Sequence, residues 1–161
     1  MPLLSREATQ RGRGAPRPYT HAMGVKAFTD EFAAAYKSEL NKSEKYRQAS
    51  KGWKWKVGLV VEADAGRNFK DPKGVLLDLF EGEARDVKMV TPEEAKAADF
   101  VITGGYSRWK DVMRKQLDPT RAMLTGKLKV KGDLATLMRY TRAANEMTEA
   151  TTRIDIDFPD E

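Results

Sequence analysis

The chain has 161 residues, 40% of them hydrophobic and 33% charged, and a formal net charge of +5. This length suits one domain with a substantial core. The absence of cysteine excludes disulfides, thiolate catalysis and cysteine-ligated zinc. No apolar run approaches the ~20 residues needed to span a bilayer. The first residues lack the apolar segment of a secretory signal, so we expect a cytoplasmic protein.

The basic charge is concentrated at the start of the chain. Residues 1–23 hold four arginines and one glutamate, which is +3 of the formal +5, so residues 24–161 carry only +2. Residues 1–22 are rich in Arg, Gly and Pro and have no hydrophobic period, so we expect a disordered basic extension. A general argument from basic charge to nucleic-acid binding is weakened accordingly.

From residue 28 on, helical and strand periods alternate. Apolar residues at helical spacing over 28–40 predict a helix, which a weaker one over 43–50 follows. The alternation from Trp53 to Glu62 predicts a strand with its lysines on the outer face. After a polar loop we expect a hairpin with strands over 75–80 and 84–90, joined at Glu81-Gly82.

The second half begins with a helix-start signal at Thr91-Pro92-Glu93-Glu94. The further predicted elements are a strand over 99–103, a helix over 106–117, a short helix from Asp118-Pro119 to Gly126, a strand over 127–131, a last helix from Gly132-Asp133 to residue 148, and an acidic tail over 151–161. Strands that follow one another, rather than regular strand–helix alternation, predict an α+β fold with helices covering one sheet face.

Catalytic chemistry finds little support in the sequence. The single histidine, His21, lies in the basic extension, so no Ser–His or Cys–His arrangement is expected. Asp155, Asp157 and Asp160 lack the spacing of a calcium loop. Gly104-Gly105 lacks the rest of a nucleotide-binding fingerprint. We therefore predict no enzymatic activity, no metal and no cofactor.

Nucleic-acid binding depends on where the lysines point. Residues 127–131 place three lysines on one strand face, and Trp53 and Trp55 alternate with Lys54 and Lys56. The tryptophans therefore face away from their neighbouring lysines, which separates a base-stacking surface from the charge. We expect solvated lysines and no nucleic-acid partner. Weak, salt-sensitive polyanion binding through the lysines and the arginine-rich extension is an alternative.

Methionines gather in the last third of the chain, at Met113, Met123, Met138 and Met147. Methionine is flexible and fills irregular apolar spaces. The pattern is typical of an ordinary core, and equally of a cavity that accepts varied apolar ligands. Periodicity does not distinguish the two.

The stretch around these methionines resembles the sterol carrier protein type-2 family. The family pattern is approximately Asp-Pro-x-x-Ala, then Gly-Lys-x-Lys-x-x-Gly-Asp before a terminal helix. The matching residues are Asp118, Pro119, Ala122, Gly126, Lys127, Lys129, Gly132 and Asp133. Residues 98–103 also resemble the family's strand before its helix, and the resemblance extends over about 28–148. The chain lacks a peroxisomal address at Phe158-Pro159-Asp160-Glu161, which favours a free-standing, prokaryote-like member.

The resemblance implies a five-stranded, mostly antiparallel sheet with helices on one face, formed by a domain over 23–150. Between sheet and helices the family encloses an apolar tunnel. It implies non-enzymatic binding and transfer or presentation of a fatty acid, fatty acyl-CoA, isoprenoid or sterol. The residues expected to line the tunnel are Phe80, Val101, Trp109, Met113, Leu117, Met123, Leu124, Leu128, Leu137 and Met138.

Two further expectations concern contact with membranes and the size of the cavity. A lipid carrier is expected to make transient contact with membrane surfaces. The alternative is an accessory or interaction protein of the same fold with a collapsed core, and a void below ~300 Å³ would favour it.

Overall fold

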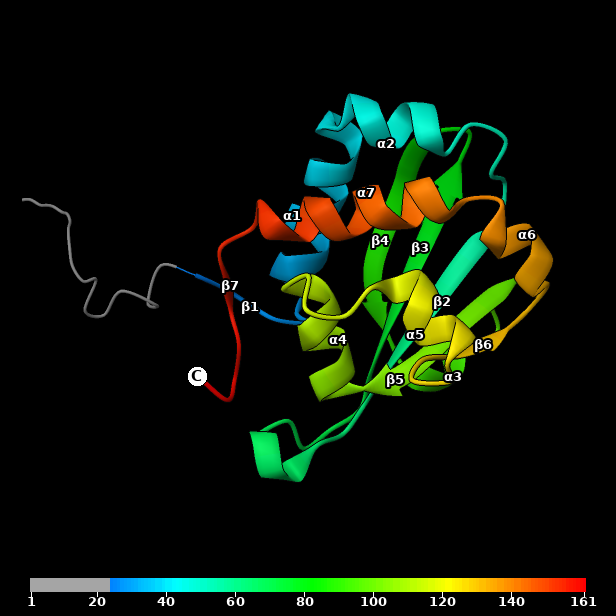
Figure 1. Ribbon diagram of the computed structural model, residues 1–161. Helices are drawn as coiled ribbons and strands as arrows, with labels where there is room; N and C mark the ends of the chain where they lie inside the picture. Colours follow the sequence, from blue (N-terminus) through cyan, green and yellow to red (C-terminus); the bar gives the residue numbers. More distant parts are fainter. Residues whose placement is uncertain (1–23) are drawn as a thin grey trace, which may run out of the picture.

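The computed structural model describes residues 24–161. The predicted disordered extension and His21 therefore lie outside the described residues. The body is built on one five-stranded sheet with the order β4-β3-β2-β5-β6 (Figure 1). Its strands are β2 (Lys56–Glu62), β3 (Lys73–Phe80), β4 (Glu83–Val90), β5 (Phe100–Gly105) and β6 (Lys129–Lys131).

The sheet is mostly antiparallel, as predicted. Strands β2 and β5 form the one parallel pair among these neighbours, and the other three pairs are antiparallel. The β3–β4 hairpin turns at Glu81 and Gly82, whose φ angles of 49° and 90° lie in the left-handed region. Consecutive positive φ angles match the right-handed twist of paired strands, so the predicted hairpin and its turn are confirmed.

Helices cover one face of the sheet (Figure 1). They are α1 (Asp30–Lys42), α2 (Glu44–Ala49), α4 (Tyr106–Met113), α5 (Pro119–Leu124), α6 (Leu134–Met138) and α7 (Thr141–Thr152). Helix α5 begins as predicted: the Asp118 carboxylate accepts a hydrogen bond from the Arg121 N–H at 2.8 Å, and Pro119 is its first residue.

The last helix was predicted as one element through residue 148, and this is wrong. The chain turns between α6 and α7, where the Arg139 N–H bonds the Thr136 carbonyl and the Tyr140 N–H bonds the Leu137 carbonyl. These tighter i→i+3 bonds end α6. The Tyr140 ring packs edge-on against Trp53, with centroids 5.0 Å apart. Packing on the distant segment that precedes β2 therefore changes the direction of a helix whose local pattern is continuous.

The opposite sheet face carries a short helix, α3 (Pro92–Ala95). It packs in a small separate core of Val60, Ala95 and Val101. Gly58 allows this close approach, because a Cβ there would lie 1.9 Å from the Ala95 carbonyl oxygen. The small size of this glycine thus seats α3 directly on the strand backbone.

The chain closes with a short parallel pair. Strand β1 (Val25–Lys26) pairs with β7 (Ile156–Asp157). Elsewhere, a single-turn 3-10 helix, η2 (Ala65–Arg67), lies in the loop after β2. Beyond β7, Phe158 is buried in the main core. None of the described helices is both long and apolar enough to cross a membrane.

Candidate apolar binding site

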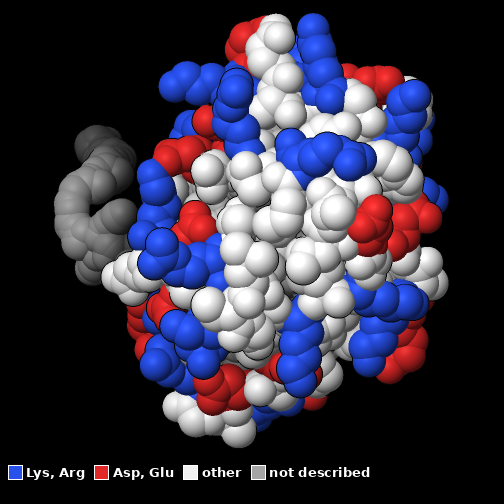
Figure 2. All heavy atoms as spheres, turned by 45° about the vertical axis from the view of Figure 1, so that its right-hand side comes forward, with Lys and Arg blue, Asp and Glu red and all other residues white. Residues whose placement is uncertain are grey.

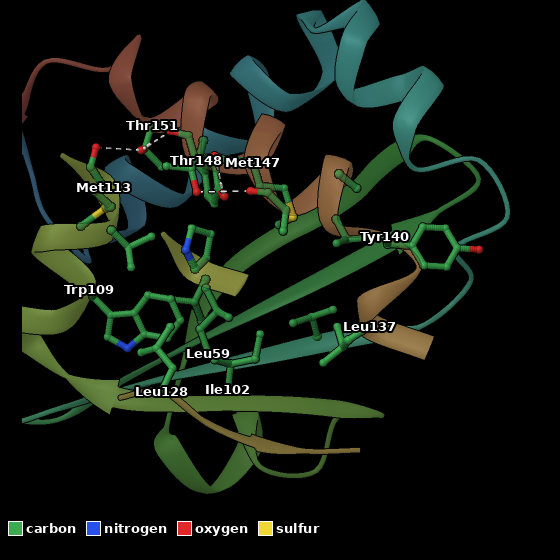
Figure 3. A pocket seen from close by; sticks show the side chains of 18 of the residues that line it. Leu59, Ile102, Trp109, Met113, Leu128, Leu137, Tyr140, Met147, Thr148 and Thr151 are labelled. Carbon is green, nitrogen blue, oxygen red and sulfur yellow. Dashed lines mark hydrogen bonds between the residues drawn. The ribbon is translucent and has the colours of Figure 1, made fainter. Parts of the chain in front are cut away.

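A cavity lies between the sheet and the helices (Figure 3). About 130 Å³ of it is open to the centre of a water-sized sphere. Its floor comes from the inner faces of β2, β3 and β5, and it consists of Val57, Leu59, Val75, Leu79 and Ile102. The helical wall is Trp109, Val112, Met113, Met123, Leu137, Ala143, Ala144 and Met147, with Phe28, Phe32 and Tyr36 from the first part of the chain.

The register of the sheet brings the floor together. In the parallel pair, Leu59 of β2 lies beside Ile102 of β5. On the antiparallel side, Leu59 pairs with Val75 of β3. Residues that lie directly opposite each other on neighbouring strands point to the same face of a sheet. These three residues therefore form a continuous aliphatic surface.

Among residues 24–161, no charged side chain lines the cavity. Most of the polar groups in the wall are already hydrogen-bonded to the protein: the Tyr36 hydroxyl donates to the Met147 carbonyl at 3.2 Å, and the Trp109 indole N–H donates to the Val60 carbonyl at 3.0 Å. Burial raises the pKa of Tyr46 to about 12, against the smaller opposing effect of a hydrogen bond with Ser50. The phenol is therefore neutral at ordinary pH, and the wall is apolar and uncharged.

The size of the cavity decides what it holds without rearrangement. It far exceeds the ~10–15 Å³ that one water needs, and it is close to the ~150 Å³ of an engineered apolar cavity that binds benzene. It lies below ~300 Å³, the lower limit of typical ligand pockets, so the size of the cavity, taken alone, favours the alternative of a collapsed core. A long-chain lipid therefore requires wall side chains to move. Met113, Met123 and Met147 supply flexible side chains for such a change.

Half of the residues predicted for the tunnel lie in the cavity wall. These are Trp109, Met113, Met123, Leu128 and Leu137. They come from three helices and from the segment before β6, which the fold brings to one side of the sheet (Figure 3). Their contact with a lipid remains a prediction.

The other predicted residues lie outside the wall. Phe80 is 37% exposed at the end of β3, with the Arg85 guanidinium 4.4 Å from its ring centroid. Leu124 is exposed on the outer side of α5. Leu117 packs against the main core without reaching the cavity, and Met138 is half-buried near the end of α6.

Val101 shows why strand faces were misassigned. It points to the small core under α3, whereas its neighbour Ile102 lines the cavity. Strand β5 is internal and apolar on both faces, so it has no polar–apolar alternation to identify the inner side. Leu59 is a wall residue that was not predicted, although the alternation of β2 had placed it on the inner face.

A second polar cluster lies at the end of the described chain, outside the cavity wall. The Lys110 ammonium is 2.9 and 3.0 Å from the two Asp160 carboxylate oxygens, and the Tyr106 hydroxyl donates to Asp160 at 2.5 Å. Lys110 is only 7% exposed. Burial acts to raise the pKa of Asp160, but hydrogen bonds from Tyr106 and Lys110 and the Lys110 charge lower it to about 2.

This cluster predicts a pH dependence of stability. Because the pKa of Asp160 falls from its ordinary value of 3.8 to about 2 on folding, its stabilising contribution is complete above about pH 4 and is lost as the pH falls toward 2. Thermal denaturation followed by circular dichroism should show a lower melting temperature for Asp160→Asn than for the wild type at pH 6, with a gap that stays constant down to about pH 4 and narrows from there to pH 2. A gap that stays constant across this range would contradict the assignment.

The described residues contain no group of three or more His, Asp or Glu side chains placed to hold a metal ion. The apolar wall described above forms a binding cavity. It can take up apolar molecules, or the apolar part of larger ones.

Comparisons with known proteins agree with this geometry. The sequence model of the SCP-2 sterol transfer family matches residues 36–145. A crystal structure of a sterol carrier protein 2 is similar to this chain at 35% identity, with a TM-score of 0.74, covering 80% of this chain and 99% of its own. No curated protein matches the sequence.

Two further solved structures are similar. One, from Thermus thermophilus, is described as a conserved hypothetical protein and possibly a sterol carrier protein; it has 35% identity and a TM-score of 0.74, covering 83% of this chain and 93% of its own. Apo sterol carrier protein 2 from Yarrowia lipolytica has 18% identity and a TM-score of 0.51, covering 81% of this chain and 97% of its own. The latter likeness concerns the fold alone.

Proposed function

Because the chain belongs to the SCP-2 sterol transfer family, we propose that it binds a lipid in the cavity between sheet and helices and delivers it without altering it chemically. The observation that carries the proposal is an apolar cavity to whose wall the described residues contribute no charged side chain. A fatty acid, an isoprenoid, a sterol or the acyl part of an acyl-CoA has the matching chemistry.

The first test asks whether the purified protein contains bound lipid. The full chain is purified without detergent and extracted with organic solvent, and the extract is examined by mass spectrometry. In parallel, a fluorescent fatty acid is displaced by unlabelled lipids at micromolar concentrations. We expect saturable displacement. An extract without lipid, together with no displacement by any of these lipid classes, would instead favour the accessory protein with a collapsed core.

Delivery of a lipid requires contact with a membrane, and one face of the molecule suits it. Leu124 of α5 is 62% exposed and Leu134 of α6 is 39% exposed. Figure 2, which turns this side of the molecule forward, shows an uncharged area bordered largely by Lys and Arg. Arg121, Lys127 and Arg139 are exposed neighbours of the two leucines in sequence.

The short helix α5 connects this face with the cavity, since Met123 lines the wall while the adjacent Leu124 points outward. Apolar side chains inside a basic border are the features by which peripheral proteins bind anionic bilayers. The proposed contact therefore places the membrane next to the helix through which a lipid would enter.

Substitution of both leucines tests the contact. A leucine buried in the bilayer contributes about 1.5–3 kcal/mol, so Leu124→Ser/Leu134→Ser should weaken binding to vesicles of phosphatidylserine and phosphatidylcholine at least ~10-fold. Sedimentation of the vesicles measures this. Phe80→Ser is the matched control, because it removes the remaining exposed large apolar side chain among the described residues. Equal losses in both variants would argue against this face.

A further inference from the structure

One residue of the cavity wall has an unfavourable backbone conformation. Phe28, in the turn between β1 and α1, has a φ angle of 57°, in the left-handed region. For a bulky side chain this conformation is an outlier, and it persists only where the surrounding structure compensates for it. Phe28 is 4% exposed and lines the cavity. Strain at this position indicates a wall residue that the rest of the fold holds in place.

Aromatic rings hold the side chain of Phe28. Its ring packs edge-on against Phe32, Phe69 and Tyr106, with centroids 5.5, 5.8 and 6.4 Å apart. Phe69 and Tyr106 also stack on each other at 4.7 Å. Of these three neighbours only Phe32 lines the cavity. Phe69 and Tyr106 therefore form a second layer behind Phe28, as seen from the cavity.

The segment after α7 binds the backbone next to Phe28. We call residues 155–161 the latch. The Val25 N–H donates to the Asp155 carbonyl at 2.8 Å, and the Ala27 N–H donates to the Asp157 carbonyl at 3.0 Å. These bonds belong to the parallel pair β1–β7, whose strands lie side by side in Figure 1. The latch thus fixes the residue that directly precedes Phe28.

The latch also binds the second aromatic layer. The Tyr106 hydroxyl donates to the Asp160 carboxylate at 2.5 Å. The side-chain amide of Asn68 donates to the Pro159 carbonyl at 3.0 Å, and Asn68 directly precedes Phe69. Both rings behind Phe28 are therefore connected to the latch, as is its backbone.

The latch has the features of a segment that opens locally. Its strand β7 forms a ladder of only two residues with β1. Phe158 is the one buried residue among 155–161. The remaining anchors are largely ionic: the Lys110 ammonium lies 2.9 Å from Asp160 and 2.7 Å from Glu161. Regions with few buried contacts and short ladders open at a lower free energy than the core of a protein.

We propose that the latch controls the size of the cavity: when it opens, Phe28 leaves its left-handed conformation, its ring moves out of the wall, and the cavity extends toward Phe69 and Tyr106. The inference rests on the proposed lipid-binding function and adds a regulation of that site. With the latch closed, the cavity keeps its 130 Å³. With the latch open, the volume of a phenyl ring becomes available to a longer ligand.

A reversible disulfide tests the latch. Lys26 and Asp157 lie opposite each other in the parallel pair, a separation that suits a disulfide. The chain has no cysteine of its own. Lys26→Cys/Asp157→Cys therefore locks the latch when it is oxidised and frees it when it is reduced. The wild type, which has no thiol, is the control for the reductant itself.

The readout is the preference for hexadecanoic acid over decanoic acid, measured by displacement of a fluorescent fatty acid below the micelle concentration of either probe. Each additional buried methylene raises affinity about fourfold. We expect oxidation to lower this preference at least ~10-fold, whereas the reduced variant behaves like the wild type. Phe28→Gly, which adopts a positive φ without strain and lacks the ring, should make the preference of the disulfide variant insensitive to oxidation.

Opening is also measured without any ligand, by amide hydrogen exchange at Val25 and Ala27. Asp160→Asn/Glu161→Gln removes the ion pairs of the latch, so it should speed this exchange and raise the preference for the longer acid. Asp78→Asn is the matched control, because it breaks an ion pair with Arg85 on another part of the molecule. It should change neither readout.

The outcomes separate the latch from lipid binding. If both acids bind but the preference is the same in the oxidised and the reduced variant, the inference is overturned and the lipid-binding function stands. Exchange that is equally slow in the wild type and in Asp160→Asn/Glu161→Gln also overturns the inference, since the ion pairs then do not hold the latch. If the wild type and all variants bind neither acid, both proposals are overturned.

Discussion

Ala144→Phe is expected to lower lipid affinity by more than ~10-fold while the protein remains folded. Ala144 is a half-buried residue of α7 that lines the cavity. A phenyl ring at this position occupies much of the 130 Å³ that a ligand would use. Inserting atoms into a packed interior typically costs about 1–3 kcal/mol of stability, and the existing void should keep the cost at the lower end.

Displacement of a fluorescent fatty acid measures the affinity, and urea denaturation measures the stability. The matched control is Asn145→Phe, which adds the same ring at the next residue of α7, on its exposed side. It should bind lipid like the wild type. If Ala144→Phe also binds normally, lipid does not occupy this cavity, and the proposed site is wrong.

Gly58→Ala is expected to lose at least ~3 kcal/mol of stability, the range of severe core substitutions. A Cβ at this position would lie 1.9 Å from the Ala95 carbonyl oxygen and 2.7 Å from its carbonyl carbon. Both are backbone atoms, so no side-chain rotation relieves the clash. Helix α3 is also held in place by a capping box, in which Thr91 and Glu94 bond each other's backbone N–H groups. Either α3 leaves the sheet or β2 bends.

Urea denaturation of Gly58→Ala checks this expectation. Gly66→Ala serves as the control, because a Cβ there meets only the Asp64 side chain, at an ordinary 3.6 Å. The control should stay within ~0.5 kcal/mol of the wild type, as exposed substitutions usually do. Equal stability of the two variants would mean that α3 does not rest on β2 as described.

Local signals along the chain determined much of the fold in advance. The turn at Glu81-Gly82 and the helix start at Asp118-Pro119 are present in the structure, and the strand predicted from Trp53 to Glu62 forms over Lys56–Glu62. Each depends on the interactions of a few neighbouring residues, so the information lies within a short stretch of sequence. The motif residues between Asp118 and Asp133 also resembled the family whose model matches residues 36–145.

The faces of the internal strands required the tertiary structure. Val101 and Ile102 are adjacent, apolar and both packed against hydrophobic neighbours, yet only Ile102 lines the cavity. A strand that is covered on both sides gains free energy from burial in either orientation. The register with Leu59 on β2 decides which residue faces the helices.

Tertiary packing also accounts for the other differences between the predicted and the observed structure. The turn at Arg139–Tyr140 follows from packing against Trp53, which is more than eighty residues away in sequence. Phe80 and Leu124 are large apolar residues, as expected for a lipid site. They are nevertheless exposed, because each is the last residue of a strand or helix that ends at the protein surface. Sequence determined most of the elements and the apolar character of the interior. Long-range packing decided where the cavity lies and which strand residues line it.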